Sequence, residues 1–169
     1  MKYLLASLLI GCLVSPSWSG ESEMALKKFV QKLENAEPWK RRKVETLLGV
    51  KLTMTSSDPR TGYTALGQFV YGEGLISDQV YLEIFAPTNE TLILRIELDD
   101  KSTCFTWGQI NKLFPNGHMD GYGIPPPGAE TYYLKERTWG ELGFGFRGGC
   151  MTSIEITTNA FIEPRQKLR

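Results

Sequence analysis

The chain has 169 residues, with 19 Lys and Arg, 19 Asp and Glu and one His, so its formal net charge is zero. This balance argues against a nucleic-acid binder, because phosphate contacts require a cationic patch. Hydrophobic residues make up 41% of the chain and charged residues 22%, which is typical of a globular protein. The length fits a single domain.

The first 19 residues have the features of a secretory signal peptide. Lys2 precedes an apolar run over residues 4–14, and the small residues Ser17 and Ser19 favour cleavage directly after them. This run is shorter than the stretch of about 20 residues that spans a membrane, and no other run in the chain is long enough. We therefore expect a single mature domain, residues 20–169, in the periplasm or secreted, with no transmembrane span.

The same leader allows a second interpretation. Residues 9–12, Leu-Ile-Gly-Cys, resemble the lipobox of bacterial lipoproteins, in which a lipid is attached to the cysteine. Only ten residues separate Met1 from Cys12, which is short for such a leader. We favour cleavage after Ser19 and keep a lipid anchor at Cys12 as the alternative.

Hydrophobic periodicity predicts an N-terminal helix over residues 21–36 and then two similar units. The first unit covers about residues 38–100. Its helix carries Val44, Leu47 and Leu48 on one face. Alternation with a period of two then predicts an antiparallel hairpin with one buried face, formed by Val80, Leu82, Ile84, Leu92, Leu94, Ile96 and Leu98.

The second unit covers about residues 101–158 and repeats this order. Its helix begins at a predicted capping box, Thr106 to Gln109, and Ile110 and Phe114 repeat the apolar spacing of the first helix. The alternating residues that face inward are Leu142, Phe144, Phe146, Cys150, Ile154 and Ile156. This recurrence indicates duplication. It predicts an α+β fold in which two tandem helix-then-antiparallel-strand units form one sheet that helices cover on one face.

The two cysteines outside the leader, Cys104 and Cys150, are expected to form a disulfide, because an even count is typical of exported proteins. Cys150 shares the inward parity of Ile154, and Cys104 precedes the helix above it. A bridge would therefore pin helix to sheet. The alternative is two unpaired buried thiols. A disulfide also argues against cysteine catalysis.

The helix that ends in Val44-Glu45-Thr46-Leu47-Leu48-Gly49, and the glycine-rich hairpin from Trp139 to Ile156, carry a family resemblance. The arrangement resembles the beta-lactamase-inhibitor-protein-like unit, which also occurs in outer-membrane assembly lipoproteins of the BamE/SmpA type. In the inhibitors the open sheet face grips an enzyme and a loop reaches its active site. The resemblance therefore implies a protein partner and makes residues 56–62 and 116–128 the inserting loops. The chain departs from the pattern in its extra N-terminal helix and in a first unit without a cysteine pair.

Parity also predicts the row of side chains that the helices leave open. This row is rich in aromatic residues, Arg and Met, which are enriched at protein interfaces. The same row also holds Glu83, Glu97, Glu141 and Glu155. We assign partner binding to Tyr81, Phe85, Arg95, Tyr133, Arg137, Trp139, Arg147 and Met151. The alternative is that these aromatics support neighbouring strands or lie beneath the N-terminal helix.

The loop over residues 116–128 contributes His118, Asp120 and Tyr122, which we add to the partner contacts. His118 and Asp120 do not predict a metal site, because such a site needs three or four ligands and the chain has no other His. We therefore expect neither a metal nor a cofactor.

The sequence holds no nucleophile elbow, phosphate-binding loop or zinc-ligand cluster, so we do not expect an enzyme. We expect an exported protein-binding or inhibitor module, such as an immunity protein that neutralises a toxin or a hydrolase. One alternative is an assembly or scaffold factor like the outer-membrane lipoproteins. Another is a binder of a small ligand or glycan in the groove between the two units.

Overall fold

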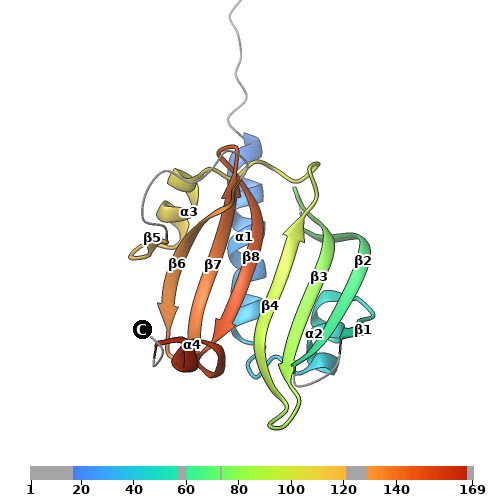
Figure 1. Ribbon diagram of the computed structural model, residues 1–169. Coiled ribbons are helices and arrows are strands. Elements are labelled where there is room, and N and C mark those ends of the chain that lie inside the picture. Colours follow the sequence, from blue (N-terminus) through green and yellow to red (C-terminus); the bar gives the residue numbers. More distant parts are fainter. Residues whose placement is uncertain (1–16, 57–59, 73, 121–128, 167–169) are drawn as a thin grey trace, which may run out of the picture.

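The computed structural model describes residues 17–56, 60–72, 74–120 and 129–166 and shows an α+β fold (Figure 1). Cys12, the lipidation site of the alternative interpretation, and the predicted contact Tyr122 lie outside the described residues. The first half of the chain contains α1 (Ser17–Glu34), α2 (Arg41–Leu48), β1 (Thr53–Ser56), β2 (Arg60–Gly72), β3 (Leu75–Phe85) and β4 (Glu90–Leu98). The second half contains α3 (Trp107–Leu113), β5 (His118–Asp120), β6 (Thr131–Arg137), β7 (Gly140–Arg147), β8 (Cys150–Thr158) and α4 (Asn159–Gln166).

Each half of the chain forms one unit, a helix followed by four antiparallel strands. The eight strands join one sheet in the order β1-β2-β3-β4-β8-β7-β6-β5. The last strands of the two units, β4 and β8, pair antiparallel at the centre, where Leu94 lies opposite Ile156 and Ile96 opposite Ile154. An approximate two-fold axis between β4 and β8 therefore relates the units. The predicted fold of two tandem units in one sheet is confirmed.

Helices α1 to α3 pack on one face of this sheet. Leu26, Phe29, Val30 and Leu33 of α1 are all buried, as the i, i+3, i+4, i+7 spacing requires. They join the same cluster as the inward residues of both units, including Val44, Leu82, Ile96, Ile110, Phe144 and Ile154. Burying each large apolar side chain contributes about 1.5–3 kcal/mol. The cluster therefore holds the helices to a single face.

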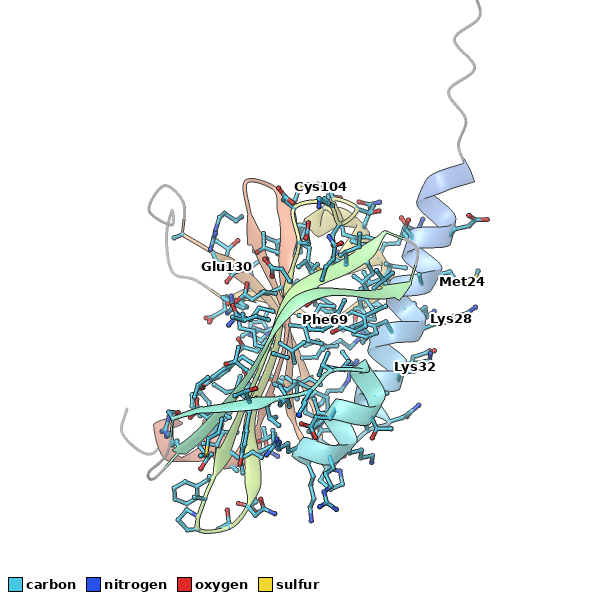
Figure 2. The ribbon with its side chains drawn as sticks, turned by 90° about the vertical axis from the view of Figure 1, so that its right-hand side faces the viewer. Met24, Lys28, Lys32, Phe69, Cys104 and Glu130 are labelled. Carbon is cyan, nitrogen blue, oxygen red and sulfur yellow. A yellow bond between two sulfur atoms is a disulfide. The ribbon has the colours of Figure 1, made fainter. Side chains whose placement is uncertain are left out.

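Among the helices that the structure describes, only α4 lies on the opposite face, at one end of it. Figure 2 shows α1 and α2 on one side of the sheet and Glu130 on the other. The C-terminal α4 closes one end of this second face, where Phe161 is buried and the Arg60 guanidinium lies 5.4 Å from its ring centre. None of the described helices has both the length and the apolar character needed to cross a membrane.

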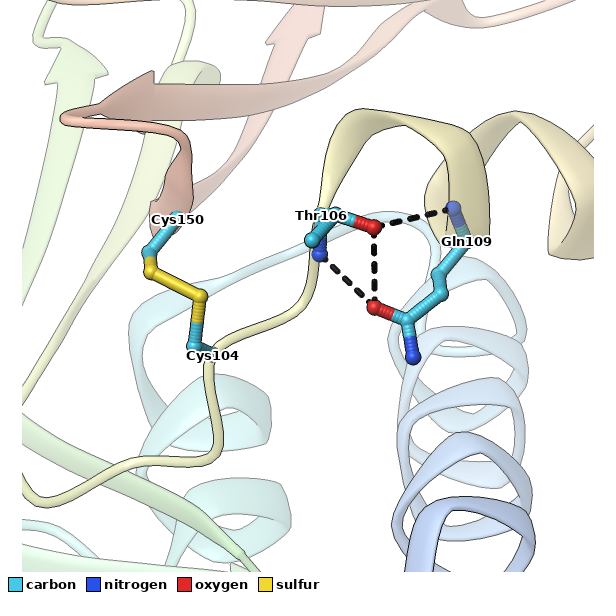
Figure 3. Close-up of a disulfide and its surroundings, with 4 residues drawn as sticks. All are labelled: Cys104, Thr106, Gln109 and Cys150. Atoms are coloured by element: carbon cyan, nitrogen blue, oxygen red, sulfur yellow. Dashed lines mark hydrogen bonds between the residues drawn. A yellow bond between two sulfur atoms is a disulfide. The ribbon is translucent and has the colours of Figure 1, made fainter.

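Two local devices fix the ends of the covering helices. Gly49 follows α2 with φ 65°, a left-handed conformation that favours glycine. The capping box at the start of α3 is confirmed: Thr106 accepts from the Gln109 N–H, and the Gln109 side chain accepts from the Thr106 N–H (Figure 3). Just before this cap, Cys104 is joined to Cys150 at the start of β8, with a Cα–Cα distance of 4.9 Å. The predicted disulfide is therefore confirmed.

We expect the variant that carries both Cys104→Ser and Cys150→Ser to lose about 4 kcal/mol of unfolding free energy, because the bridge closes a long loop. The two cysteines are 46 residues apart. Urea denaturation of this variant beside the oxidised wild type measures the difference. Equal midpoints and slopes would show that the bridge does not restrict the unfolded chain.

Candidate functional site

The candidate site is the side of the sheet that faces away from α1, which we call the open face. Cross-strand register fixes its residues, since paired residues project from the same side of a sheet. Along one row, Tyr81 lies opposite Arg95, and Arg95 lies opposite Glu155. Glu155 in turn lies opposite Gly143, and Gly143 opposite Leu134. This row crosses from the first unit to the second without interruption.

Arg95 stands at the centre of the open face and holds three carboxylates. Its guanidinium lies 2.6 Å from Glu130 and 3.3 Å from Glu155, and it also pairs with Glu97. The same guanidinium donates to the hydroxyl of Tyr132. Burial alone would lower the pKa of Arg95, but Glu97 and Glu130 raise it well above its usual value. The cation is therefore a permanent anchor for the surrounding acids.

Glu130, just before β6, is the most enclosed of these acids, with 10% of its side chain exposed. Its carboxylate accepts hydrogen bonds from Tyr132 at 2.6 Å, from Ser153 at 3.1 Å and from Thr152. Burial alone would raise the pKa of Glu130, but the bonds from Thr152, Tyr132 and Arg95 lower it to about 2. Glu130 is therefore an anion that the fold holds in one place.

Gly145 of β7 makes room for this network, and Gly143 makes room for the neighbouring Leu134. A Cβ at Gly145 would lie 2.6 Å from the Glu130 carboxylate oxygen and 2.3 Å from the Ser153 hydroxyl. A Cβ at Gly143 would lie 3.2 Å from the Leu134 side chain. The periodicity of the sequence does not single out Glu130 or Tyr132. The usable signal is a glycine inside a strand, which marks a close approach by another group.

The open face is acidic overall. Its described residues bring together two guanidinium groups, Arg60 and Arg95, with the carboxylates Glu83, Glu97, Asp120, Glu130, Glu136, Glu141 and Glu155. Burial raises the pKa of Glu141, and the neighbouring carboxylates add to the rise although His118 opposes it. Burial is the main cause of this shift, and the crowding of like charges adds to it.

The helix side has the opposite charge. Residues 17–51, which include α1 and α2, hold eight Lys and Arg and five Glu. Figure 2 shows Lys28 and Lys32 on the outer side of α1, away from the sheet. A chain with zero net charge is thus divided into a basic helix layer and an acidic sheet face.

Several residues predicted to bind a partner lie on the open face or at its rim. Tyr81 projects from it, and its hydroxyl donates to Glu83 at 3.0 Å. Arg95 is its centre, as described above. His118 and Asp120 are exposed on β5, opposite Leu134 and Tyr132. Phe85 is partly exposed at the end of β3, and Arg147 is exposed at the turn between β7 and β8.

The predicted exposure of Tyr133 and Arg137 is wrong. Tyr133 lies opposite Phe144 and is 1% exposed, and its hydroxyl lies 2.8 Å from the Phe114 carbonyl oxygen. Arg137 projects from the same side and pairs with Glu34 of α1. Adjacent tyrosines make the alternation of β6 ambiguous by one residue, and packing against α3 and Phe144 selects Tyr133 for the core.

Trp139 and Met151 are also assigned to the wrong side. Trp139 packs edge-on against buried Trp39, with 4.7 Å between ring centres. Met151 is 3% exposed and lies opposite Phe146. The register of β7 and β8 shifts between Gly145 and Phe146. The alternation counted back from Ile154 therefore fails at the start of β8, and Met151 faces the core. The alternative, in which the aromatics support neighbouring strands, holds for Tyr133, which lies opposite Phe144.

A pocket of about 610 Å³ lies beside the open face, past the last β4–β8 pair, Glu97 and Ser153. Its wall includes Asp78, Asp99, Asp100, Arg147 and both bridged cysteines. Among the described residues, no group of three or more His, Cys, Asp or Glu is placed to hold a metal ion.

Fold and site together define a two-unit α+β protein with a basic helix layer and an acidic open face. A scan against protein-family models and searches of curated proteins and of solved structures give no match for the chain.

Glu130→Gln should change how stability depends on pH. The pKa of Glu130 is about 2 in the folded protein, against an ordinary value of 4.5. The ionised group therefore stabilises the fold above pH 4.5, and this contribution, about 3 kcal/mol, is lost as the pH falls from 4.5 towards 2. Urea midpoints measured from about pH 7 to about pH 3 should fall less steeply in the variant. Glu136→Gln, at an exposed glutamate of β6, is the control and should follow the wild type. Parallel curves for Glu130→Gln and wild type would contradict the network.

Proposed function

We propose that the chain is an exported protein-binding module that holds a basic surface of another protein against its open face. An inhibitor of a hydrolase or an immunity protein against a toxin is the concrete form. The observation that supports this proposal is the separation of charge between the two faces of the sheet. Such a field draws a partner of opposite charge and orients it before contact.

The rigidity of the acidic groups supports binding over simple solvation. Glu97, Glu130 and Glu155 are fixed by one guanidinium, so a partner does not have to immobilise them. Fixing side chains before binding reduces the entropy cost of association. Tyr81 and Leu134 stand in the same row and add apolar contact area between the charges. The resemblance to inhibitor units, in which an open sheet face grips an enzyme, favours the same reading.

We propose no catalytic chemistry for this face. A general acid or base works best when its pKa lies near the working pH. The pKa of Glu130 is about 2, and its oxygens already accept several hydrogen bonds. This arrangement suits a fixed anion, not a group that exchanges protons.

The place of action that we propose is the periplasm or the exterior of the cell. The disulfide between Cys104 and Cys150 favours an oxidising compartment. Cleavage after Ser19 would remove the first three residues of α1. We expect mass spectrometry of the mature protein to find Gly20 at the N-terminus. A lipidated Cys12 would instead favour the assembly or scaffold lipoprotein alternative.

The variant Glu136→Lys with Glu141→Lys tests the open face. These glutamates lie opposite each other on β6 and β7. Reversing both charges should weaken binding of a basic partner at least about tenfold, because like charges at an interface are unfavourable. The measurement is capture from periplasmic extract by immobilised protein, followed by calorimetry with the captured protein at two salt concentrations.

The matched control is Glu21→Lys with Glu37→Lys, which makes the same charge change at exposed residues on the helix side of the molecule. It should capture the same protein as the wild type. Equal loss in both variants, or no loss in either, would show that the open face is not the binding surface.

A further inference from the structure

The two outer edges of the sheet are incompletely covered. The short strand β1 pairs with β2 only at residues 62–64. At the other edge, β5 pairs with β6 only at residues 132–134. Among the described strands, none pairs with the outer side of β2 at residues 65–72 or of β6 at residues 135–137. An uncovered strand edge offers backbone N–H and C=O groups to another strand.

These two free edges differ in charge. The free part of β6 is Lys135-Glu136-Arg137, with a charge at every position. The free part of β2 is Ala-Leu-Gly-Gln-Phe-Val-Tyr-Gly, without a charged residue. Charged residues on an edge strand prevent unwanted pairing. The edge of β6 is thus protected by charge. The corresponding edge of β2 in the other unit has no charge, and its register with β3 shifts between Leu66 and Phe69 and between Val70 and Gly72.

The free part of β2 also carries exposed apolar side chains. Leu66 and Val70 are 76% and 70% exposed, more than the other exposed large hydrophobics of the described residues. The inward residues are in use: Phe69 packs against the core, and Tyr71 stacks on Phe29 of α1 with 4.6 Å between ring centres. The outer edge of this strand therefore stays unpaired among the described strands, and the side chains of Leu66 and Val70 stay outside the core.

We propose that two copies of the chain pair antiparallel through the free edges of β2, about a two-fold axis perpendicular to the sheet. A second copy of the chain fits this edge because the edge is self-complementary. A two-fold axis brings like residues close together, so a charged edge would repel itself, whereas this edge carries no charge. Leu66 and Val70 of each copy then lie near the axis and cover one another. The two acidic open faces lie side by side on the same side of one continuous sheet.

Sedimentation velocity over a range of concentrations tests this pairing with the oxidised, full mature chain. We expect a reversible dimer in the wild type. Val70→Lys should raise the dimer dissociation constant at least about tenfold, because it places like charges together at the axis. Leu66→Lys should act in the same way. Both side chains are largely exposed, so the substitutions leave the core of each copy intact.

The matched control is Met119→Lys, which adds the same charge at an exposed residue of the opposite edge strand, 44% exposed. It should dimerise like the wild type. Amide hydrogen exchange of the wild type, which needs no variant to fold, should show protection at residues 66–72 that rises with protein concentration. A wild-type protein that stays monomeric up to its solubility limit overturns the proposal. The free edge of β2 would then be available to a strand of another protein. A dimer that persists in both lysine variants also overturns it.

Discussion

The pairing of β4 with β8 is the contact on which the rest of the structure depends. It joins the last strands of two units, with Leu94 opposite Ile156 and Ile96 opposite Ile154. Because both units present their helices to the same side, the joined sheet has one covered face and one open face. The N-terminal α1 lies on the covered face and adds Leu26, Phe29, Val30 and Leu33 to the shared core. If β4 and β8 paired one residue out of step, every side chain of one unit would change faces.

The same pairing creates the charged network. Arg95 and Glu155 are direct partners across the β4–β8 junction. Glu130 reaches them from the far side of the second unit, over a strand whose Gly145 has no side chain to obstruct it. One guanidinium therefore ties the two units together on the face that the apolar core does not reach. The carboxylates that Arg95 does not neutralise give the open face a net negative charge. This negative charge is the reason we propose a basic partner.

The sequence predicts the parts of this structure that depend on local pattern. Helical spacing identifies α2 and α3, and alternation identifies β3 and β4. The capping box lies where its motif places it, and the even number of cysteines outside the leader predicts the disulfide. Parity fails where a long-range contact decides between neighbours. Tyr132 and Tyr133 are equivalent to a pattern search, and only packing against Phe144 separates them. The register shift beside Phe146 moves Met151 to the covered face, and no local pattern announces it. The only sign of Glu130 in the sequence is Gly145, the strand glycine that leaves room for it.

The most direct test of this account is the register of the central strand pair. Interstrand backbone nuclear Overhauser effects in isotopically labelled protein report which residues face each other. We expect contacts between Leu94 and Ile156, between Arg95 and Glu155, and between Ile96 and Ile154. Contacts shifted by one residue, or no contacts between β4 and β8, would contradict the single open face and everything inferred from it.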